Sequence, residues 1–112
     1  MFDLLKRALW KGGDNYAAAD VADAIRNGKA QVFQHGDSVV VTEIVSHPRR
    51  KELNLWLAAG SWDELTALDP TLKEFGRKNG CERIVAHCRR GLTQRMKAIG
   101  FREASRTFVM EI

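Results

Sequence analysis

Apolar residues recur along this chain with two periods, one typical of helices and one typical of strands. Val21 and Ile25 lie four residues apart within an alanine-rich stretch, which predicts a helix over residues 17–27. Three segments rich in β-branched and apolar residues follow, separated by short polar turns, and this arrangement predicts an antiparallel meander. We expect its strands at residues 30–34, 39–45 and 53–58.

The third predicted strand carries leucines at alternate positions around a tryptophan. Leu53, Leu55 and Leu57 stand at every second position, so a regular strand puts them on one face of the sheet. The same alternation puts Trp56 on the opposite face. We therefore expect Trp56 to pack beneath a helix on that side.

The second half of the chain alternates helices with strands. Ser61 followed by Glu64 is a capping-box pattern at a helix start, and Pro70 suits the first turn of a second helical segment. A strand, a helix and one or two terminal strands are then expected at residues 83–87, 92–99 and 101–112. One parallel pairing through a right-handed crossover follows. The predicted fold class is α/β (α+β), a mixed sheet in which an antiparallel meander precedes a β-α-β-α-β order.

The first residues form a separate unit in this interpretation. Phe2, Leu5 and Leu9 share one stripe of a short amphipathic helix, which a pair of glycines interrupts. We therefore divide the chain into an N-terminal helical appendage, residues 1–13, and a domain, residues 14–112. The appendage either packs on its own chain or docks on another protein.

Composition fits one domain with one hydrophobic core. The 112 residues are 45% hydrophobic and 29% charged, which is ordinary for a globular domain. The chain has no run of about 18 apolar residues, so we expect no membrane span. Its first residues do not resemble a secretory signal. Cys81 and Cys88 lack the spacing of a zinc or redox pair, which favours two free thiols in a reducing cytoplasm.

Basic residues are in excess in the second half of the chain. The net charge is +4, and the stretch from Lys73 to Arg106 holds ten basic residues against three acidic ones. This surplus is either a solvated surface or a patch for the phosphates of CoA or nucleic acid. No aromatic residue is interleaved with the basic pairs to stack on bases, so we do not expect nucleic-acid binding. The histidines and cysteines match no metal-ligand spacing, so we expect no metal site.

Several short motifs resemble those of the GNAT acyltransferases. Ile99-Gly100-Phe101 is similar to the Leu-Gly-Phe signature at that family's joint between helix and strand. Four further stretches resemble small GNAT-like proteins encoded by tailed phages and prophages; they lie at residues 41–45, 53–60, 80–83 and 89–91. The resemblance covers roughly residues 17–112. It implies the GNAT fold, with the N-terminal helix in place of the usual first strand.

The resemblance implies acetyl-CoA binding. In the family, the central strand separates from its neighbour and offers main-chain groups to pantetheine, and the next helix start donates N–H groups to the pyrophosphate. The corresponding cofactor-binding residues are Leu57, Ala58, Ala59, Gly60 and Ser61. The chain departs from the family's motif just afterwards. Trp62 stands where a second small residue belongs, and Asp63 and Glu64 add two carboxylates to the same turn.

The resemblance also implies a set of catalytic groups. Many GNAT enzymes protonate the leaving thiolate with a tyrosine four residues before the glycine of the Leu-Gly-Phe signature. This chain has Met96 at that position, and its only tyrosine, Tyr16, is far away in sequence. The candidate catalytic bases for the amine proton are Glu43 on the meander and His87 at the end of the crossover strand. His47 is a third choice.

Two functions remain open at this point, and nucleic-acid binding through the surplus from Lys73 to Arg106 is a third, weaker option. One is an acetyl-CoA-dependent N-acyltransferase of phage or prophage origin, with an amine acceptor as its second substrate. The other is a non-catalytic, GNAT-like interaction protein that binds phage structural proteins through its N-terminal helix and is associated with the virion. Both functions place the protein either in the cytoplasm of the host cell or in a virion.

Overall fold

The structure, a computed structural model, describes residues 18–88 and 90–112. The expected N-terminal appendage, residues 1–13, lies outside the described residues. The described elements are α2 (Ala18–Arg26), β1 (Gln31–His35), β2 (Ser38–His47), β3 (Arg50–Ala59), α3 (Trp62–Ala67), α4 (Asp69–Lys78), β4 (Arg83–Ala86), the 3₁₀ turn η1 (Arg90–Leu92) and α5 (Thr93–Ala98).

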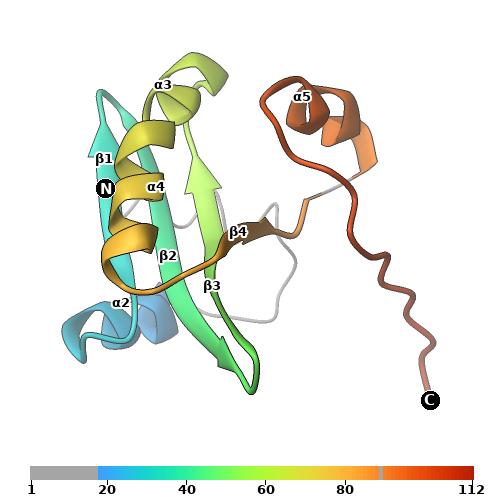
Figure 1. Ribbon diagram of the computed structural model, residues 1–112, viewed down its shortest axis with the longest axis horizontal. Helices are drawn as coiled ribbons and strands as arrows, with labels where there is room; N and C mark the ends of the chain where they lie inside the picture. The colour runs from blue at the N-terminus through green and yellow to red at the C-terminus, as the bar shows by residue number, and fades with distance from the viewer. Residues whose placement is uncertain (1–17, 89) are drawn as a thin grey trace.

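A four-stranded sheet forms the centre of the described chain, in the order β1-β2-β3-β4 (Figure 1). β1 pairs with β2 and β2 with β3 in antiparallel fashion, whereas β3 and β4 are parallel. The predicted mixed sheet, an antiparallel meander followed by a crossover, is therefore confirmed. The crossover is made by α3 and α4, which carry the chain from the end of β3 to the start of β4.

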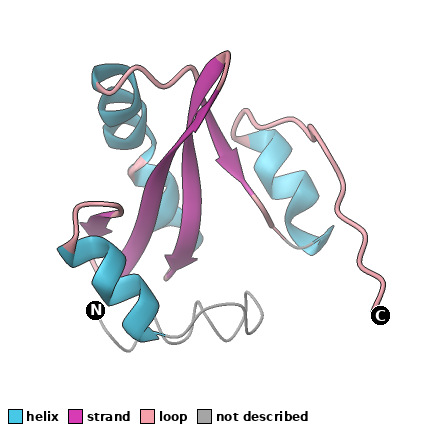
Figure 2. Cartoon of the chain, turned by 90° about the horizontal axis from the view of Figure 1, so that it is seen from below, coloured by secondary structure: helices cyan, strands magenta, loops and turns pink. Residues whose placement is uncertain are grey.

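Helices cover both faces of the sheet (Figure 2). On one face, Val21 of α2 packs in a cluster with alternate residues of β2, including Val39 and Val41. On the other face, Leu68 and Leu72, from the α3–α4 crossover, pack with Val40, Leu53 and their neighbours. Consecutive valines of β2 therefore enter opposite cores, as the two-residue period of a strand requires.

The start of each crossover helix follows its local sequence signal. The Ser61 side chain accepts a hydrogen bond from the Glu64 backbone N–H at 3.2 Å, so the predicted capping box is confirmed. Pro70 stands in the first turn of α4, where a missing N–H has no consequence because the first turn lacks intrahelical acceptors. The longest helix in the described part of the chain has 10 residues, and none there is long and apolar enough to span a membrane.

A bulge in β3 changes which residues face which core. Val41 pairs with Leu57 and Thr42 with Leu55, so Trp56 is an extra residue inserted into the register between β2 and β3. The inserted residue reverses the alternation beyond it. Leu53 and Leu55 pack on the α3–α4 side, whereas Leu57 joins Trp56 in the α2 cluster. The prediction that the three leucines share one face was wrong for Leu57, and the expected packing of Trp56 is confirmed.

The end of the chain differs from the prediction. Residues 101–112 contain no strand, although one or two were expected. Their apolar side chains are largely exposed, with Phe108 at 87% and Met110 at 89% of their full accessible surface. The alternating pattern that indicated a strand is present, but a strand also needs a neighbour with free backbone groups. The segment runs past α5 and away from the sheet in both views (Figures 1 and 2).

Candidate functional site

The two parallel strands at the centre of the candidate site pair for only part of their length. β3 and β4 are joined from the Glu52–Arg83 pair to the Leu55–Ala86 pair. Beyond Leu55 no strand of the described chain pairs with that edge of β3, while its other edge stays paired with β2 as far as Ala59. The bulge at Trp56 stands where the pairing stops, and bulges bend and twist the strand that holds them.

The opened edge includes residues 57–59, and all three are predicted cofactor-binding residues. Leu57 is buried on the α2 side, while Ala58 is exposed and Ala59 half-buried. An unpaired strand edge presents main-chain N–H and C=O groups to any extended ligand that lies beside it. The small side chains of the two alanines leave access to that backbone.

The chain turns from β3 into α3 at Gly60 and Ser61, the other two predicted cofactor-binding residues. Gly60 has a φ of 131°, and a Cβ there would lie 2.0 Å from Ser38 Oγ and 2.6 Å from Ser38 Cα. Glycine is therefore required for this turn to lie against the start of β2. The Ser61 backbone N–H donates to Ser38 Oγ at 2.9 Å. Ser61 is thus engaged within the chain through both its main chain and its side chain.

The Glu64 carboxylate is directed at the β1–β2 turn. It accepts a 2.7 Å hydrogen bond from Ser38 Oγ and a 3.3 Å hydrogen bond from the Asp37 backbone N–H. The hydrogen bond from Ser38 is the main reason that the pKa of Glu64 is below its ordinary value. Gly36 makes room for this contact, because a Cβ there would overlap the carboxylate at 1.6 Å. These donors therefore keep the Glu64 carboxylate charged and hold it against the β1–β2 turn.

Trp62 links α3 to α5. The guanidinium carbon of Arg95 lies 5.8 Å from the centre of the indole ring, within the range of a cation–π contact. Trp62 is half-buried and Arg95 is exposed. The contact brings a positive charge to the first turn of α3. In the sequence, the charged residues of that turn are all acidic.

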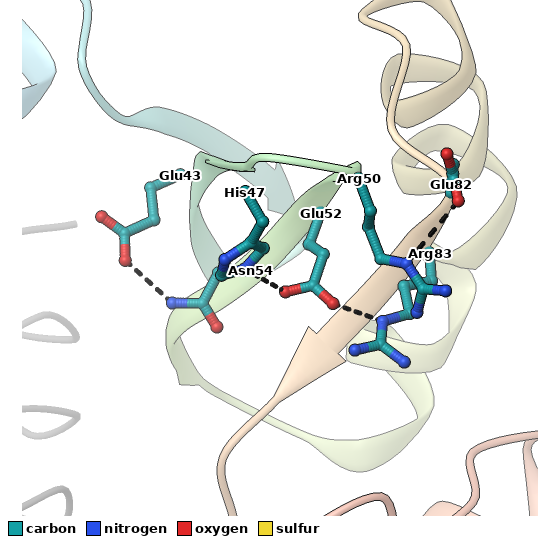
Figure 3. A network of polar contacts seen from close by, with 7 residues as sticks. All are labelled: Glu43, His47, Arg50, Glu52, Asn54, Glu82 and Arg83. Carbon is teal, nitrogen blue, oxygen red and sulfur yellow. Dashed lines mark hydrogen bonds and ion pairs between the residues drawn. The ribbon is translucent and has the colours of Figure 1, made fainter.

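Glu43, one of the two predicted bases, lies on β2 opposite Asn54 of β3. Asn54 Nδ2 donates a 2.8 Å hydrogen bond to Glu43 Oε1, which fixes the direction of the carboxylate (Figure 3). Glu43 is half-buried. Asn54 Oδ1 is buried and has no hydrogen-bond partner among the described residues. One carboxylate oxygen and one amide oxygen therefore lie just before the point where β3 and β4 part.

The two histidines considered as bases have different surroundings. His87 is exposed and follows the last residue of β4, so no strand holds it. The His47 ring is already engaged within the chain, because a 2.7 Å hydrogen bond joins its Nε2 to Glu52 Oε1. Among the described residues, no hydrogen bond or ion pair joins His87 to Glu43, so these two do not form a pair. The catalytic roles of Glu43 and His87 stay predictions.

A buried carboxylate that sequence reasoning missed joins three elements next to this site. Glu52 is 7% exposed and accepts hydrogen bonds from His47 and from Arg83 Nε of β4 (Figure 3). The hydrogen bond from Arg83 is the main reason that the pKa of Glu52 is lowered. A sequence signal was present. Glu52 precedes the first residue of the predicted strand 53–58, and Arg83 is the first residue of the predicted strand 83–87. The two strands were predicted to run parallel, so their starts meet at one edge of the sheet.

This cluster makes stability depend on pH. A lowered folded-state pKa means that Glu52 contributes stability above its unfolded pKa of about 4.3 and loses that contribution as pH falls through the folded value. We expect Glu52→Gln to cost about 1 kcal/mol at pH 7, since both partners are partly solvated, and to cost less at pH 3. Urea unfolding at the two pH values measures this, with Glu82→Gln as the control for losing an exposed carboxylate. Equal costs at both pH values would contradict the assignment.

The cysteines and acidic residues give no sign of metal chemistry. Cys81 is half-buried, and desolvation raises the pKa of its thiol, which makes it a poor nucleophile. Cys88 is exposed. Within residues 18–88 and 90–112, no group of three histidine, cysteine, aspartate or glutamate side chains is arranged to hold a metal ion.

An extended thioester cofactor fits one part of this site and not another. The outer edge of residues 57–59, which no described strand covers, and the two small alanines fit the amide groups of a pantetheine arm. The start of α3 fits a diphosphate less well, because the Ser61 N–H is already donated to Ser38 and two carboxylates belong to that turn. The opened edge of β3 is therefore the part of this site that fits such a cofactor best.

Neither a family model nor a curated protein matches this sequence. Solved structures match over nearly the whole chain. An acetyltransferase from Trypanosoma brucei has a TM-score of 0.66 and 17% identity, over 100% of this chain and 95% of its own. The aminoglycoside N-acetyltransferase AAC(6')-Iy, solved in complex with CoA, has a TM-score of 0.72 and 14% identity, over 99% of this chain and 85% of its own.

A third match is glucosamine-6-phosphate N-acetyltransferase from Arabidopsis thaliana, with a TM-score of 0.70 and 11% identity, over 99% of this chain and 88% of its own. At these identities the likeness concerns the fold. The same antiparallel meander, crossover and parallel strand were derived above from the chain itself. The chain has the fold of the GNAT acetyltransferases.

Proposed function

We propose that this chain binds acetyl-CoA along the opened edge of β3 and transfers the acetyl group to an amine. The observation that carries the proposal is the parting of β3 and β4 after Leu55 and Ala86, which leaves residues 57–59 paired with β2 on one edge and with no described strand on the other. Two proteins of the same fold support it: one is an aminoglycoside acetyltransferase in complex with CoA, and the other acetylates glucosamine 6-phosphate, as their names state.

The cofactor would supply an activated acetyl thioester. In this proposal the main-chain groups of Leu57, Ala58 and Ala59 hold its pantetheine arm as an added strand would be held. Ser61 takes part only if its backbone N–H gives up the hydrogen bond to Ser38 and donates to a phosphate oxygen instead. Arg95, held over Trp62, supplies positive charge at that turn. The cofactor-binding roles of Leu57 to Ser61 are thus part of this proposal.

We assign the general base to Glu43 rather than to His87. Glu43 is half-buried, and Asn54 holds its carboxylate in one direction, so the other oxygen is left to accept the proton from the acceptor amine. His87 is exposed beyond the end of β4 and has no such support. Asn54 is a positioning residue in this scheme, since it acts through Glu43.

A second candidate is a non-catalytic protein of the same fold. The observations that favour it are the internal engagement of Ser61, the contact of Trp62 with Arg95, and Met96 at the position of the family's acid. The resemblance to phage-encoded proteins supports a phage or prophage origin for either candidate, with a place in the host cytoplasm or in the virion. Partner proteins of the virion would then be the ligands, through the N-terminal helix.

Calorimetric titration with acetyl-CoA separates the two candidates. The enzyme proposal predicts micromolar binding. Ser61→Asp should weaken it at least tenfold, because aspartate keeps the helix cap but adds a negative charge at the diphosphate position. Ser46→Asp, on the exposed end of β2, is the control for charge alone and should bind like the unmodified chain. No heat at millimolar acetyl-CoA would reject the enzyme and leave the non-catalytic candidate.

A further inference from the structure

A pocket of about 600 Å³ lies at the start of β3, beside the turn that joins this strand to β2. Three of its lining residues are arginines and one is a glutamate; the full set is His47, Pro48, Arg49, Arg50, Glu52 and Arg83. The predicted cofactor-binding residues stand at the far end of the same strand, and the nearest of them, Leu57, is about 17 Å from Glu52 at the usual rise of a strand. The pocket is therefore separate from the proposed cofactor site.

The strand register brings the charged side chains of this pocket to one face of the sheet. His47 pairs with Arg50 across the β2–β3 turn, and Glu52 pairs with Arg83 of β4. Residues that pair directly point to the same face, and so do residues two positions apart on one strand, such as Arg50 and Glu52. The turn between β2 and β3 adds Arg49. Three strands and a turn therefore contribute to the pocket.

Two of the guanidinium groups are held by carboxylates. Arg83 Nε donates to the buried carboxylate of Glu52, and Arg50 Nε lies 3.6 Å from Glu82 Oε2. In Figure 3 the terminal nitrogens of both arginines point away from these carboxylates. A guanidinium has five N–H donors, so each group is oriented by the chain and still has donors for a ligand. Arg49 is exposed and pairs with no carboxylate in the described part of the chain.

The charges of the pocket suit a phosphate better than a carboxylate. Three guanidinium groups outnumber the two carboxylates that pair with them, so positive charge remains for a ligand. A phosphate monoester carries up to two negative charges on three terminal oxygens, and arginine binds such oxygens in pairs. A carboxylate carries one charge and is satisfied by one guanidinium. The volume also leaves room for the organic part of a small ester.

We propose that this pocket binds the phosphate group of a small phosphate monoester. A nucleic acid fits it less well, because the six described lining residues include no phenylalanine, tyrosine or tryptophan on which a base could stack. The site does not depend on acetyl-CoA binding, since its residues lie at the other end of β3.

Titration of the isotope-labelled full chain with glycerol phosphate tests this site directly. At about pH 7.5 the ester is above its second pKa of about 6. At constant ionic strength, the backbone amides of residues 49–52 and 83 should shift and saturate, with a dissociation constant of about 1 mM or below. Inorganic phosphate should bind no more tightly, because it lacks the organic part. Tenfold tighter binding of inorganic phosphate, or no saturable shift at these residues, would overturn the proposal.

Arg49→Gln with Arg50→Gln should raise this dissociation constant at least about tenfold, because two donors of charge-assisted hydrogen bonds are lost. The matched control is Arg102→Gln with Arg106→Gln. Both pairs are exposed, and each contains one arginine that pairs with a glutamate. The control removes the same net charge and should change the constant less than about threefold.

Two outcomes with these variants and with DNA would also overturn the proposal. Equal weakening by both double variants would show an effect of net charge alone. Tighter binding of short duplex DNA than of the ester at residues 49–52, with an affinity that falls steeply with added salt, would assign the pocket to nucleic acid instead. Circular dichroism shows whether each variant is folded.

Discussion

Replacing Glu43 with glutamine is expected to lower kcat/KM for acetyl transfer by about 10²- to 10⁴-fold, the usual contribution of a general base. Glutamine has nearly the same shape and keeps an oxygen for the hydrogen bond from Asn54, so the fold should be unaffected. The loss arises because a neutral amide cannot accept the amine proton. Steady-state kinetics with a panel of primary amines measures it.

Two comparison variants make this result specific. Glu82→Gln removes an exposed carboxylate that pairs with Arg50 at 3.6 Å, so it controls for the change in net charge and should alter the rate less than about threefold. His87→Gln tests the other candidate base. A large loss with His87→Gln and none with Glu43→Gln would contradict the assignment made here.

Replacing Gly60 with alanine is expected to destabilise the chain by about 3 kcal/mol or more. Alanine is strained at a φ of 131°, and its Cβ would overlap both the side chain and the Cα of Ser38, so backbone must move. Chemical denaturation of the folded protein measures the loss. The turn from β3 into α3 would shift away from the start of β2, because that contact cannot be kept.

Gly100→Ala is the matched control for this prediction. Gly100 also has a positive φ, 104°, but a Cβ there has no atom within 4 Å. Its replacement should therefore cost only the backbone strain, about 1–2 kcal/mol. If the two alanine variants lose the same stability, the close approach of Ser38 to Gly60 has no energetic role.

Structure that depends on residues close together in the chain could be predicted from the sequence. The capping box of Ser61 and Glu64 and the proline in the first turn of α4 predicted both helix starts, because each depends on residues at most three positions apart. The meander was readable for the same reason, since short polar turns join neighbouring strands. These elements account for the fold class and for the place of the strand that carries the site.

Contacts between residues far apart in the chain could not be predicted from the sequence. The hydrogen bond from Ser38 to Glu64 spans 26 positions, and nothing in the capping box indicates that its carboxylate also reaches the β1–β2 turn. A single inserted residue at Trp56 reversed the faces beyond it, and alternation alone cannot show an insertion. The terminal strands failed for another reason: alternation marks a segment that is able to form a strand, while the partner strand decides whether it does.

The most direct test of the open β3 edge is a titration of the isotope-labelled protein with acetyl-CoA, followed by backbone amide resonances. The account predicts that the amides of residues 56–59 shift at micromolar ligand, while those of Val32 and Phe33, on the opposite outer strand, do not. Unchanged resonances of residues 56–59 at millimolar acetyl-CoA would contradict the account, whatever happens elsewhere in the spectrum.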